Sequence, residues 1–197
     1  MNRIASSIWT RVLLAALVLS AALGWIVYNR MTILKNGREI VLKSEPVDPR
    51  DLFRGHYVRL GYAISRLKGD DRLLKGLGHL KRNQTVYVTV KPGADGYWVL
   101  DSASTVMPPP EDGKVTLKGR VEYPVFPHGG RVSYGIERYY APRKKALALE
   151  KRMARSSAAR GREERPLGVI VRVAPNGRAA IAGLMLDGRK IYEEPLF

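Results

Sequence analysis

The feature that most constrains this chain is an uninterrupted apolar run near its N-terminus. Residues 12–28 contain no charged side chain, and arginines lie on both sides of the run at Arg11 and Arg30. Trp9 and Tyr28 are nineteen residues apart, which at helical rise is about 29 Å, close to the thickness of a bilayer's hydrocarbon core. Aromatic rings at that separation suit the two membrane interfaces. The sequence therefore predicts one transmembrane anchor over residues 12–28.

A cleaved signal peptide is the alternative reading of this run. Ser20, Ala21 and Ala22 form a small-residue processing site after a short apolar region, as signal peptides do. Apolar residues continue past that site to Val27, which favours a retained anchor. Because a short N-terminal tail stays inside while a long domain is translocated, we expect residues 1–11 in the cytoplasm and the C-terminal domain outside it.

The chain is strongly basic and has no cysteine. It contains 34 Lys and Arg against 18 Asp and Glu, which gives a formal net charge of +16. The lack of cysteine excludes thiolate nucleophiles, Cys-ligated zinc and iron–sulfur clusters. The charge suits nucleic acid, anionic lipid or an acidic partner. Since an exported domain seldom meets nucleic acid, we expect no nucleic-acid partner.

Beyond the anchor, apolar and polar residues alternate with period two between clusters of turn residues, the pattern of β-strands. Two short stretches, Pro92–Gly96 and Pro175–Gly177, have the turn chemistry of hairpin loops. The domain is therefore predicted to be mainly β. The expected strands are Glu39–Lys43, Tyr57–Ile64, Thr85–Val90, Tyr97–Asp101, Val115–Val121, Arg131–Tyr139, Gly168–Ala174 and Ala179–Leu184.

The two halves of this domain resemble one another. Val58–Tyr62 is echoed by Val132–Ile136, and Val86–Gly93 is echoed by Val169–Gly177. In each half a strand with a central glycine precedes an insertion and then a hairpin. We therefore expect a duplicated β unit, packed as one domain because each half is too short to cover its own apolar face.

A Pro-rich stretch, residues 108–113, lies near the middle and reads as a stiff exposed linker. It divides a first β unit, residues 38–107, from a second, residues 114–197. Chance similarity between strand–turn–strand patterns is the competing explanation.

The second unit contains a strongly basic insertion. Residues 143–166 carry nine Lys or Arg against three Glu. At 100° per residue the apolar side chains share one arc and Lys151, Arg152 and Arg155 occupy the other, which predicts a basic amphipathic helix over residues 143–155. This helix either lies on anionic lipid headgroups or packs its apolar stripe on the sheet. Glu150 interrupts the apolar arc, which favours packing.

The stretch DPRDLFRGHYVRLGY, residues 48–62, gathers many polar and aromatic side chains. Asp48 followed by Pro49 has the chemistry of a helix start, and Gly55 can end that helix. The residues that follow alternate as a strand does. Structural roles therefore account for most of the stretch. The side chains left for function are Arg50, Arg54 and Tyr57.

The same stretch carries a family likeness. Gly55-His56-Tyr57-Val58-Arg59-Leu60-Gly61-Tyr62 matches a Gly-Asp-Tyr pattern except that His56 stands in place of the aspartate. With Asp48–Arg54 and Tyr134–Tyr140, it resembles the GDYXXLXY family of membrane-anchored bacterial proteins. The resemblance implies a single-pass protein of the bacterial inner membrane with a periplasmic domain, often encoded beside a polytopic membrane protein. It implies no particular reaction, and His56 weighs against catalysis at that position.

An enzyme reading has few candidate groups. Asp48, Asp51 and Glu137 are the candidate catalytic carboxylates. A hydrolase would need two of them on opposite sides of a cleft. Glu137 falls in an expected strand between Arg131 and Arg138, so a structural salt bridge is favoured. The three histidines share no ligand spacing, and we expect no metal site and no cofactor.

We therefore expect a binding or scaffolding module that partners an integral membrane protein, with anionic lipid or an envelope polymer as other partners. An envelope hydrolase using Glu137 or Asp51 as general acid or base is the alternative. Tyrosine and arginine often carry interface energy. The expected binding patch is Arg50, Arg54, Tyr57, Arg59, Glu137, Arg138 and Tyr139.

Overall fold

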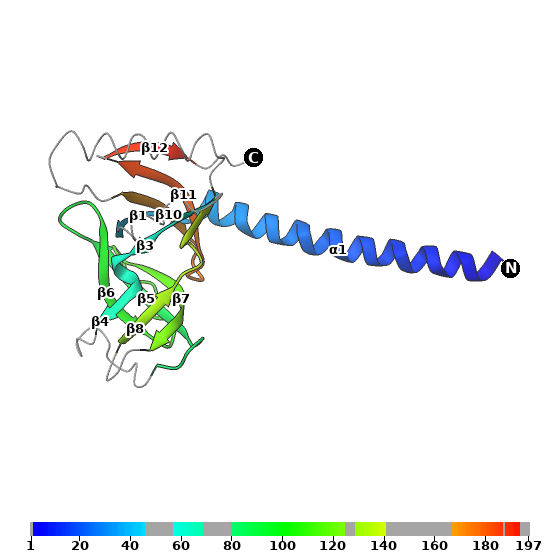
Figure 1. Ribbon diagram of the computed structural model, residues 1–197, viewed down its shortest axis with the longest axis horizontal. Helices are drawn as coiled ribbons and strands as arrows, with labels where there is room; N and C mark the ends of the chain where they lie inside the picture. Colours follow the sequence, from blue (N-terminus) through cyan, green and yellow to red (C-terminus); the bar gives the residue numbers. More distant parts are fainter. Residues whose placement is uncertain are drawn as a thin grey trace.

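One long helix leaves one side of a β domain (Figure 1). The computed structural model describes residues 2–45, 57–68, 80–124, 129–140, 167–186 and 188–193. The helix, α1 (Asn2–Asn36), includes the expected anchor. Its segment Ile8–Asn36 is long and apolar enough to cross a membrane. Its large apolar side chains are exposed, Leu13 to 69% and Trp25 to 66%. Such a surface is unfavourable in water and suits lipid.

The strands form one large sheet and one small ladder. Ten strands make a sheet in the order β12-β11-β10-β1-β6-β5-β7-β8-β4, with β3 paired to β1, and β2 pairs with β9 separately. The predicted mainly β fold after one N-terminal helix is confirmed. The strands are β1 (Arg38–Glu45), β2 (Tyr57–Arg59), β3 (Gly61–Tyr62), β4 (Arg66–Lys68), β5 (Thr85–Pro92), β6 (Trp98–Ser104), β7 (Val115–Pro124), β8 (Gly129–Ser133), β9 (Arg138–Tyr140), β10 (Gly168–Val173), β11 (Ala179–Leu186) and β12 (Arg189–Glu193).

Both expected hairpins are present, as β5–β6 and β10–β11. Their turns are closed in the same way. The amide of Gly93 donates to the carbonyl of Tyr97 at 2.8 Å, and the amide of Ala174 donates to the carbonyl of Arg178 at 2.9 Å. In each turn the next-to-last residue is a glycine with positive φ, 80° in the first and 79° in the second. Glycine adopts this conformation without steric cost.

Two expected strands are interrupted. The segment expected as Tyr57–Ile64 forms β2, β3 and a 3₁₀ turn, η1 (Ala63–Ser65), and the segment expected as Arg131–Tyr139 splits into β8 and β9. The interruption occurs because the pairing partner changes along each segment: β2 pairs with β9, whereas β4 pairs with β8.

Neither β4 nor β12 is expected from the sequence. The amphipathic helix expected over residues 143–155 lies outside the described residues.

The two halves exchange strands to build the core. Six residue pairs join β1 of the first half to β10 of the second, and six join β5 of the first half to β7 of the second. Side chains from all four strands meet in one buried cluster that includes Ile40, Val88, Leu117 and Val171. Two copies related by a two-fold axis would pair reciprocally in this way. The duplicated β unit stays a prediction, and this reciprocal pairing supports it.

The end of α1 is fixed to the sheet. Ile33 is 7% exposed, and its carbonyl accepts from the amide of Gly37 at 2.9 Å. The guanidinium of Arg172 donates to the carbonyl of Gly37 at 3.3 Å, and that of Arg38 donates to the carbonyl of Lys114 at 3.2 Å. These contacts join the last turn of α1 to β10 and to the start of β7, so the helix direction and the domain are coupled.

Candidate functional site

Two segments far apart in sequence lie antiparallel at the centre of the domain. We call residues 57–68 and 129–140 the crossing segments. At one end Val58 is opposite Tyr139 in the β2–β9 ladder, and at the other end Leu67 is opposite Gly130 in the β4–β8 ladder. The expected binding patch draws most of its members from these two segments, so their geometry decides what the patch can do.

A reciprocal pair of tyrosines joins the crossing segments. The hydroxyl of Tyr62 donates to the carbonyl of Ile136 at 2.7 Å, and the hydroxyl of Tyr134 donates to the carbonyl of Ile64 at 2.6 Å. Tyr62 is 1% exposed and Tyr134 is 6% exposed. Each tyrosine therefore holds the carbonyl two residues beyond its counterpart, inside the core.

This reciprocity corrects the alignment of the two halves. The sequence comparison matched Val58–Tyr62 with Val132–Ile136, but the hydrogen bonds match Leu60–Ile64 with Val132–Ile136. In this register RLGYAISR, residues 59–66, aligns with RVSYGIER, residues 131–138, and arginine, tyrosine and isoleucine recur at the same places. This register differs by two residues from the one expected from the sequence, which took the glycine of each strand as its fixed point.

The tyrosines are held in their neutral form. Burial raises the pKa of Tyr62 well above its usual value, and the negative charge of Glu137 raises it further. Burial followed by the same charge also raises the pKa of Tyr134. A buried phenol without a cationic neighbour loses its proton at a high energetic cost. The pair is therefore suited to a structural role rather than to proton transfer near neutral pH.

Glu137 closes the turn between β8 and β9. Its two carboxylate oxygens accept hydrogen bonds from the backbone amides of Tyr134 and Gly135. The expectation that Glu137 lies in a strand was wrong, because the chain turns here with Gly135 at a φ of 78°. Arg131, one of the arginines expected beside it, has an ion pair with Glu122 at 3.5 Å. Charge-assisted bonds to amides are among the stronger hydrogen bonds, so this carboxylate has a structural task.

The other members of the expected patch have different surroundings. Tyr139 is 4% exposed and belongs to the core, so it is not a surface group. Arg138 is exposed, and the backbone of Arg59 is opposite it in the β2–β9 ladder. The backbone of Tyr57 lies at the end of the same ladder. The remaining sequence candidates lie outside the described residues: Arg50, Asp51, Arg54, Lys151, Arg152 and Arg155.

A cavity with a mixed apolar and polar lining at the junction of helix and sheet was missed by the sequence reasoning. It has a volume of about 540 Å³ and is lined by the end of α1, the Pro-rich linker and Asp101. Asp101 has ion pairs with Lys91 and Lys114, each at 2.9 Å. These lysines hold the pKa of Asp101 below its usual value. No sequence signal could have found this group, because its members come from β5, β6 and the residue before β7.

The chemistry available in these places is limited. Asp101 is kept ionised by two cations, which makes it a weak base, and Glu137 is occupied by backbone amides. Efficient acid–base catalysis needs a group whose pKa lies near the working pH. Within the described residues no group of three or more His, Cys, Asp or Glu side chains could hold a metal ion. The carboxylates of Asp101 and Glu137 are thus both engaged by neighbouring groups of the fold.

Comparison with known proteins gives one match. The family model described as GDYXXLXY protein matches residues 19–184. No curated protein and no solved structure matches the chain. The matched region includes the C-terminal part of α1, both crossing segments and both hairpins.

Proposed function

Because the chain belongs to the GDYXXLXY family and carries a helix able to cross a membrane, we propose that it is a single-pass membrane-anchored binding or scaffolding module. Its β domain docks on a polytopic membrane protein of the bacterial envelope. The anchor lies in the inner membrane with its N-terminus in the cytoplasm and its domain in the periplasm. The family match adds no reaction or partner to this proposal.

The fixed junction between α1 and the sheet is the observation that carries the proposal. An exposed apolar helix needs lipid or another helix as its surroundings. A flexible tether would let the domain sample all orientations, whereas the bonded junction at Gly37 presents one side of the domain to the bilayer. Anchoring also raises the effective concentration of a membrane partner without stronger contacts. This design suits a domain that must meet its partner at a set height and angle.

The docking surface we assign is the one that includes the β2–β9 ladder. The exposed Arg138 lies there, and Tyr57 and Arg59 occupy the paired strand. Arg54 precedes this strand in the sequence. Tyrosine and arginine are enriched among the residues that dominate interface energies. Because Tyr139 and Glu137 support the ladder from within, they set its shape rather than contact the partner.

Co-purification tests this proposal. The full chain, extracted in mild detergent, should carry a polytopic protein with it. Tyr57→Ala and Arg54→Ala should each lower the recovered partner about tenfold or more, the loss expected for residues that dominate an interface. Lys43→Ala, an exposed change on β1, is the matched control and should leave recovery unchanged. If Tyr57→Ala and Arg54→Ala both fold and retain every partner, this surface is not the docking surface.

The alternative is an envelope hydrolase that uses Glu137 or Asp51. The amide variants Glu137→Gln and Asp51→Asn separate the two functions, since catalysis would be abolished while binding by a folded variant would be largely spared. The backbone bonds of Glu137 favour the binding function.

A further inference from the structure

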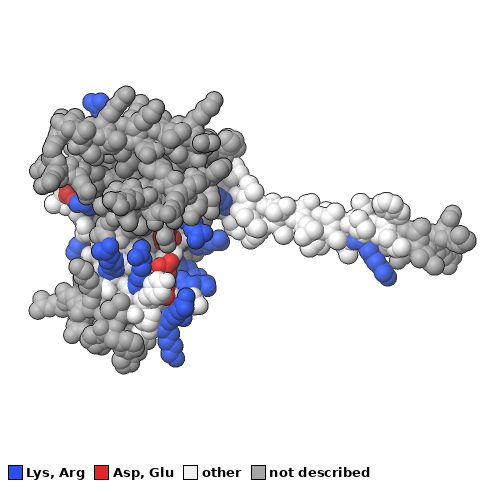
Figure 2. All heavy atoms as spheres, in the orientation of Figure 1, with Lys and Arg blue, Asp and Glu red and all other residues white. Residues whose placement is uncertain are grey.

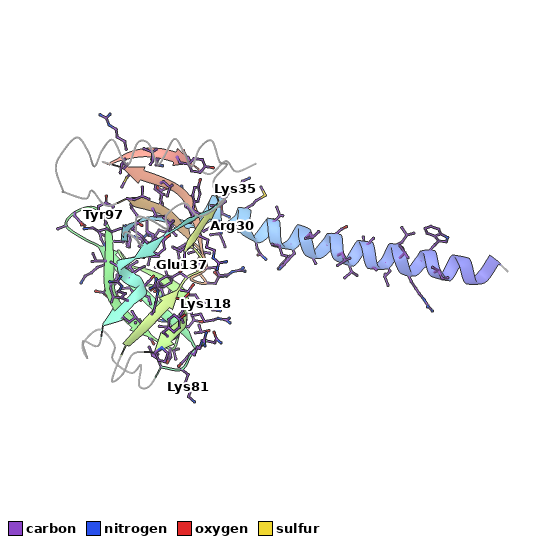
Figure 3. The ribbon with its side chains drawn as sticks, viewed as in Figure 1. Arg30, Lys35, Lys81, Tyr97, Lys118 and Glu137 are labelled. Atoms are coloured by element: carbon purple, nitrogen blue, oxygen red, sulfur yellow. The ribbon has the colours of Figure 1, made fainter. Side chains whose placement is uncertain are left out.

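Basic side chains occur on several sides of the domain, including the side from which α1 leaves (Figure 2). Figure 3 places Lys118 and Lys81 on that side with Arg30 and Lys35 of α1, whereas Tyr97 lies on the opposite side. If α1 crosses the membrane, this is the side that faces the bilayer.

The basic side chains are held in place by strand β7. Lys118 and Arg120 project from its outer face, since they alternate with buried residues along the strand. On one side of them, the amide of Lys118 donates to the carbonyl of Gly177 at 2.8 Å. This bond fixes the hairpin turn that carries Arg178. We call Lys81, Lys118, Arg120 and Arg178 the basic face.

The turn that carries Lys81 is fixed at the other end. The amide of Asn83 donates to the carbonyl of Val121 at 2.8 Å, and the amide of Val121 donates to the carbonyl of Gln84 at 2.9 Å. The basic face therefore consists of one strand and two turns, all joined by backbone hydrogen bonds, and its charges cannot move apart without breaking the sheet.

Acidic groups nearby are already neutralised. Glu122 has an ion pair with Arg131, Glu137 accepts from backbone amides, and Asp101 lies between two lysines. All four side chains of the basic face are exposed. Across the ranges that the structure describes, none of the four forms an ion pair. Among the described residues, the basic face thus carries positive charge that no carboxylate pairs with.

A shallow hollow lies within the basic face. It has a volume of about 460 Å³ and is lined by Lys118, Arg120 and the polar side chains of Asn83, Thr85 and Ser133. Glu122 also lines it, and its carboxylate has the ion pair with Arg131. Two cations with amide and hydroxyl donors are the groups that bind a phosphate. The hollow has room for one phosphate and part of the headgroup attached to it.

The distance to the membrane is short. Nine residues separate Tyr28, the expected interfacial ring, from Gly37 at the sheet, which is about 13 Å along a helix. The headgroup layer on each side of a bilayer occupies about 5 to 8 Å of this distance, and the Debye length in physiological salt is about 8 Å. Gly37 therefore lies within that range once α1 is inserted, on the side of the domain that carries Lys118 and Lys81 (Figure 3).

We propose that the basic face docks on anionic phospholipid headgroups and that the hollow takes a headgroup phosphate. The inference rests on the proposed function, because it needs α1 to span the bilayer. Docking would restrain the tilt of the domain against the bilayer, and so would hold the β2–β9 ladder at a set height and angle for a partner in the same membrane. Lipid is the occupant favoured over a protein because the helix that sets this face's direction is itself the expected membrane span.

The test uses the full chain in nanodiscs of phosphatidylcholine alone or mixed with phosphatidylglycerol. Since the chain has no cysteine, Tyr123→Cys, an exposed position on β7 outside the hollow, provides a single site for a fluorophore beside the basic face. A nitroxide on the lipid headgroup quenches that fluorophore when the face is docked. A label at Ala94→Cys, in the exposed turn beside Tyr97, reports the opposite side.

We expect stronger quenching at Tyr123→Cys in the anionic nanodiscs than in the neutral ones, and weak quenching at Ala94→Cys in both. Raising the salt from about 0.1 M to 1 M shortens the Debye length from about 10 to 3 Å and should remove the difference. Lys118→Gln with Arg120→Gln should lower the docked-to-undocked ratio about 25-fold, because each basic residue near an anionic surface contributes about fivefold.

Lys43→Gln is the matched control for charge. Lys43 is opposite Gly168 in the β1–β10 ladder, next to the Tyr97 ring on the far side, and its change should not alter quenching. Equal quenching in neutral and anionic nanodiscs overturns the inference, as does a Lys43→Gln effect equal to that of the double variant. A chain that is washed off the nanodiscs at alkaline pH overturns the proposed function as well, so the two failures are distinguishable.

Discussion

The two crossing segments make the same contact with different local chemistry. Tyr62 and Tyr134 each donate to a carbonyl of the other segment, in matching positions. After the tyrosine, the first segment turns through η1, whereas the second turns through Gly135 with its positive φ and the carboxylate of Glu137. The comparison indicates that the buried tyrosine hydrogen bonds determine how the two segments contact each other. The turn after each tyrosine is built from different residues.

Alkaline pH should break both tyrosine bonds and gives the largest expected effect. Burial raises the pKa of Tyr62 and of Tyr134 in the folded protein, while in the unfolded chain each titrates near 10. Above that pH the unfolded chain loses protons that the folded protein retains, so the free energy of unfolding falls by about 1.4 kcal/mol per pH unit for each tyrosine. Below pH 10 the contribution is fully present. Urea unfolding in detergent, followed by the fluorescence of Trp98 in a chain in which Trp9 and Trp25 are replaced by phenylalanine, measures this slope.

The variants Tyr62→Phe and Tyr134→Phe show how much each tyrosine contributes to this slope. Each should lower stability at neutral pH by about 1–3 kcal/mol, because a buried carbonyl loses its donor. Each should also reduce the alkaline slope by about 1.4 kcal/mol per pH unit, and by the same amount if the segments are equivalent. A slope that changes in only one variant would show that the two tyrosines are not equivalent.

Glu137 and Ser65 occupy matching places in the two segments, and their loss should have unequal effects. Glu137→Gln weakens two bonds to backbone amides and should cost about 1–3 kcal/mol. The hydroxyl of Ser65 is buried without a hydrogen-bond partner among the described residues. Ser65→Ala should therefore be neutral or stabilising by up to about 1 kcal/mol. Thermal denaturation measures the stability of both variants. Equal destabilisation by Glu137→Gln and Ser65→Ala would contradict the unequal roles of the two side chains.

Sequence patterns predicted the elements that depend on local chemistry. Both hairpin turns are predicted by turn-forming residues, Pro-Gly-Ala-Asp-Gly at 92–96 and Pro-Asn-Gly at 175–177. Strand β7 is predicted by the alternation of apolar and polar residues over Val115–Val121. The apolar run likewise predicts α1. These features need no knowledge of distant residues, because turn geometry and side-chain period are properties of a few neighbours.

The parts that the sequence did not predict depend on long-range pairing. An unbroken strand over Tyr57–Ile64 is the natural reading of its alternation, but the partner strand changes within it from β9 to β1. The ion pairs of Asp101 join positions from three elements. Tyr139 has the residue type of a binding group, and only the packing of the crossing segments shows that it is buried. Composition cannot reveal which polar or aromatic residues a fold covers.

The smallest expected effect concerns the turn glycine that distinguishes the second segment. Gly135 has a φ of 78°, and a Cβ there would meet no atom within 4 Å, so Gly135→Ala should cost only the backbone penalty of about 1–2 kcal/mol. Gly135→Asn should cost less, since asparagine tolerates this conformation. At the matching place, Ala63→Gly should cost no more than about 1 kcal/mol, the entropic effect alone. Urea unfolding measures the two costs at residue 135. A larger loss of stability for alanine than for asparagine indicates backbone strain, because the larger asparagine side chain would cost more if packing were the cause. If Gly135→Ala and Gly135→Asn cost the same, the backbone of the turn changes conformation to accept either side chain. The hydrogen bonds of Glu137, rather than the conformation of Gly135, would then hold residues 129–140 against residues 57–68.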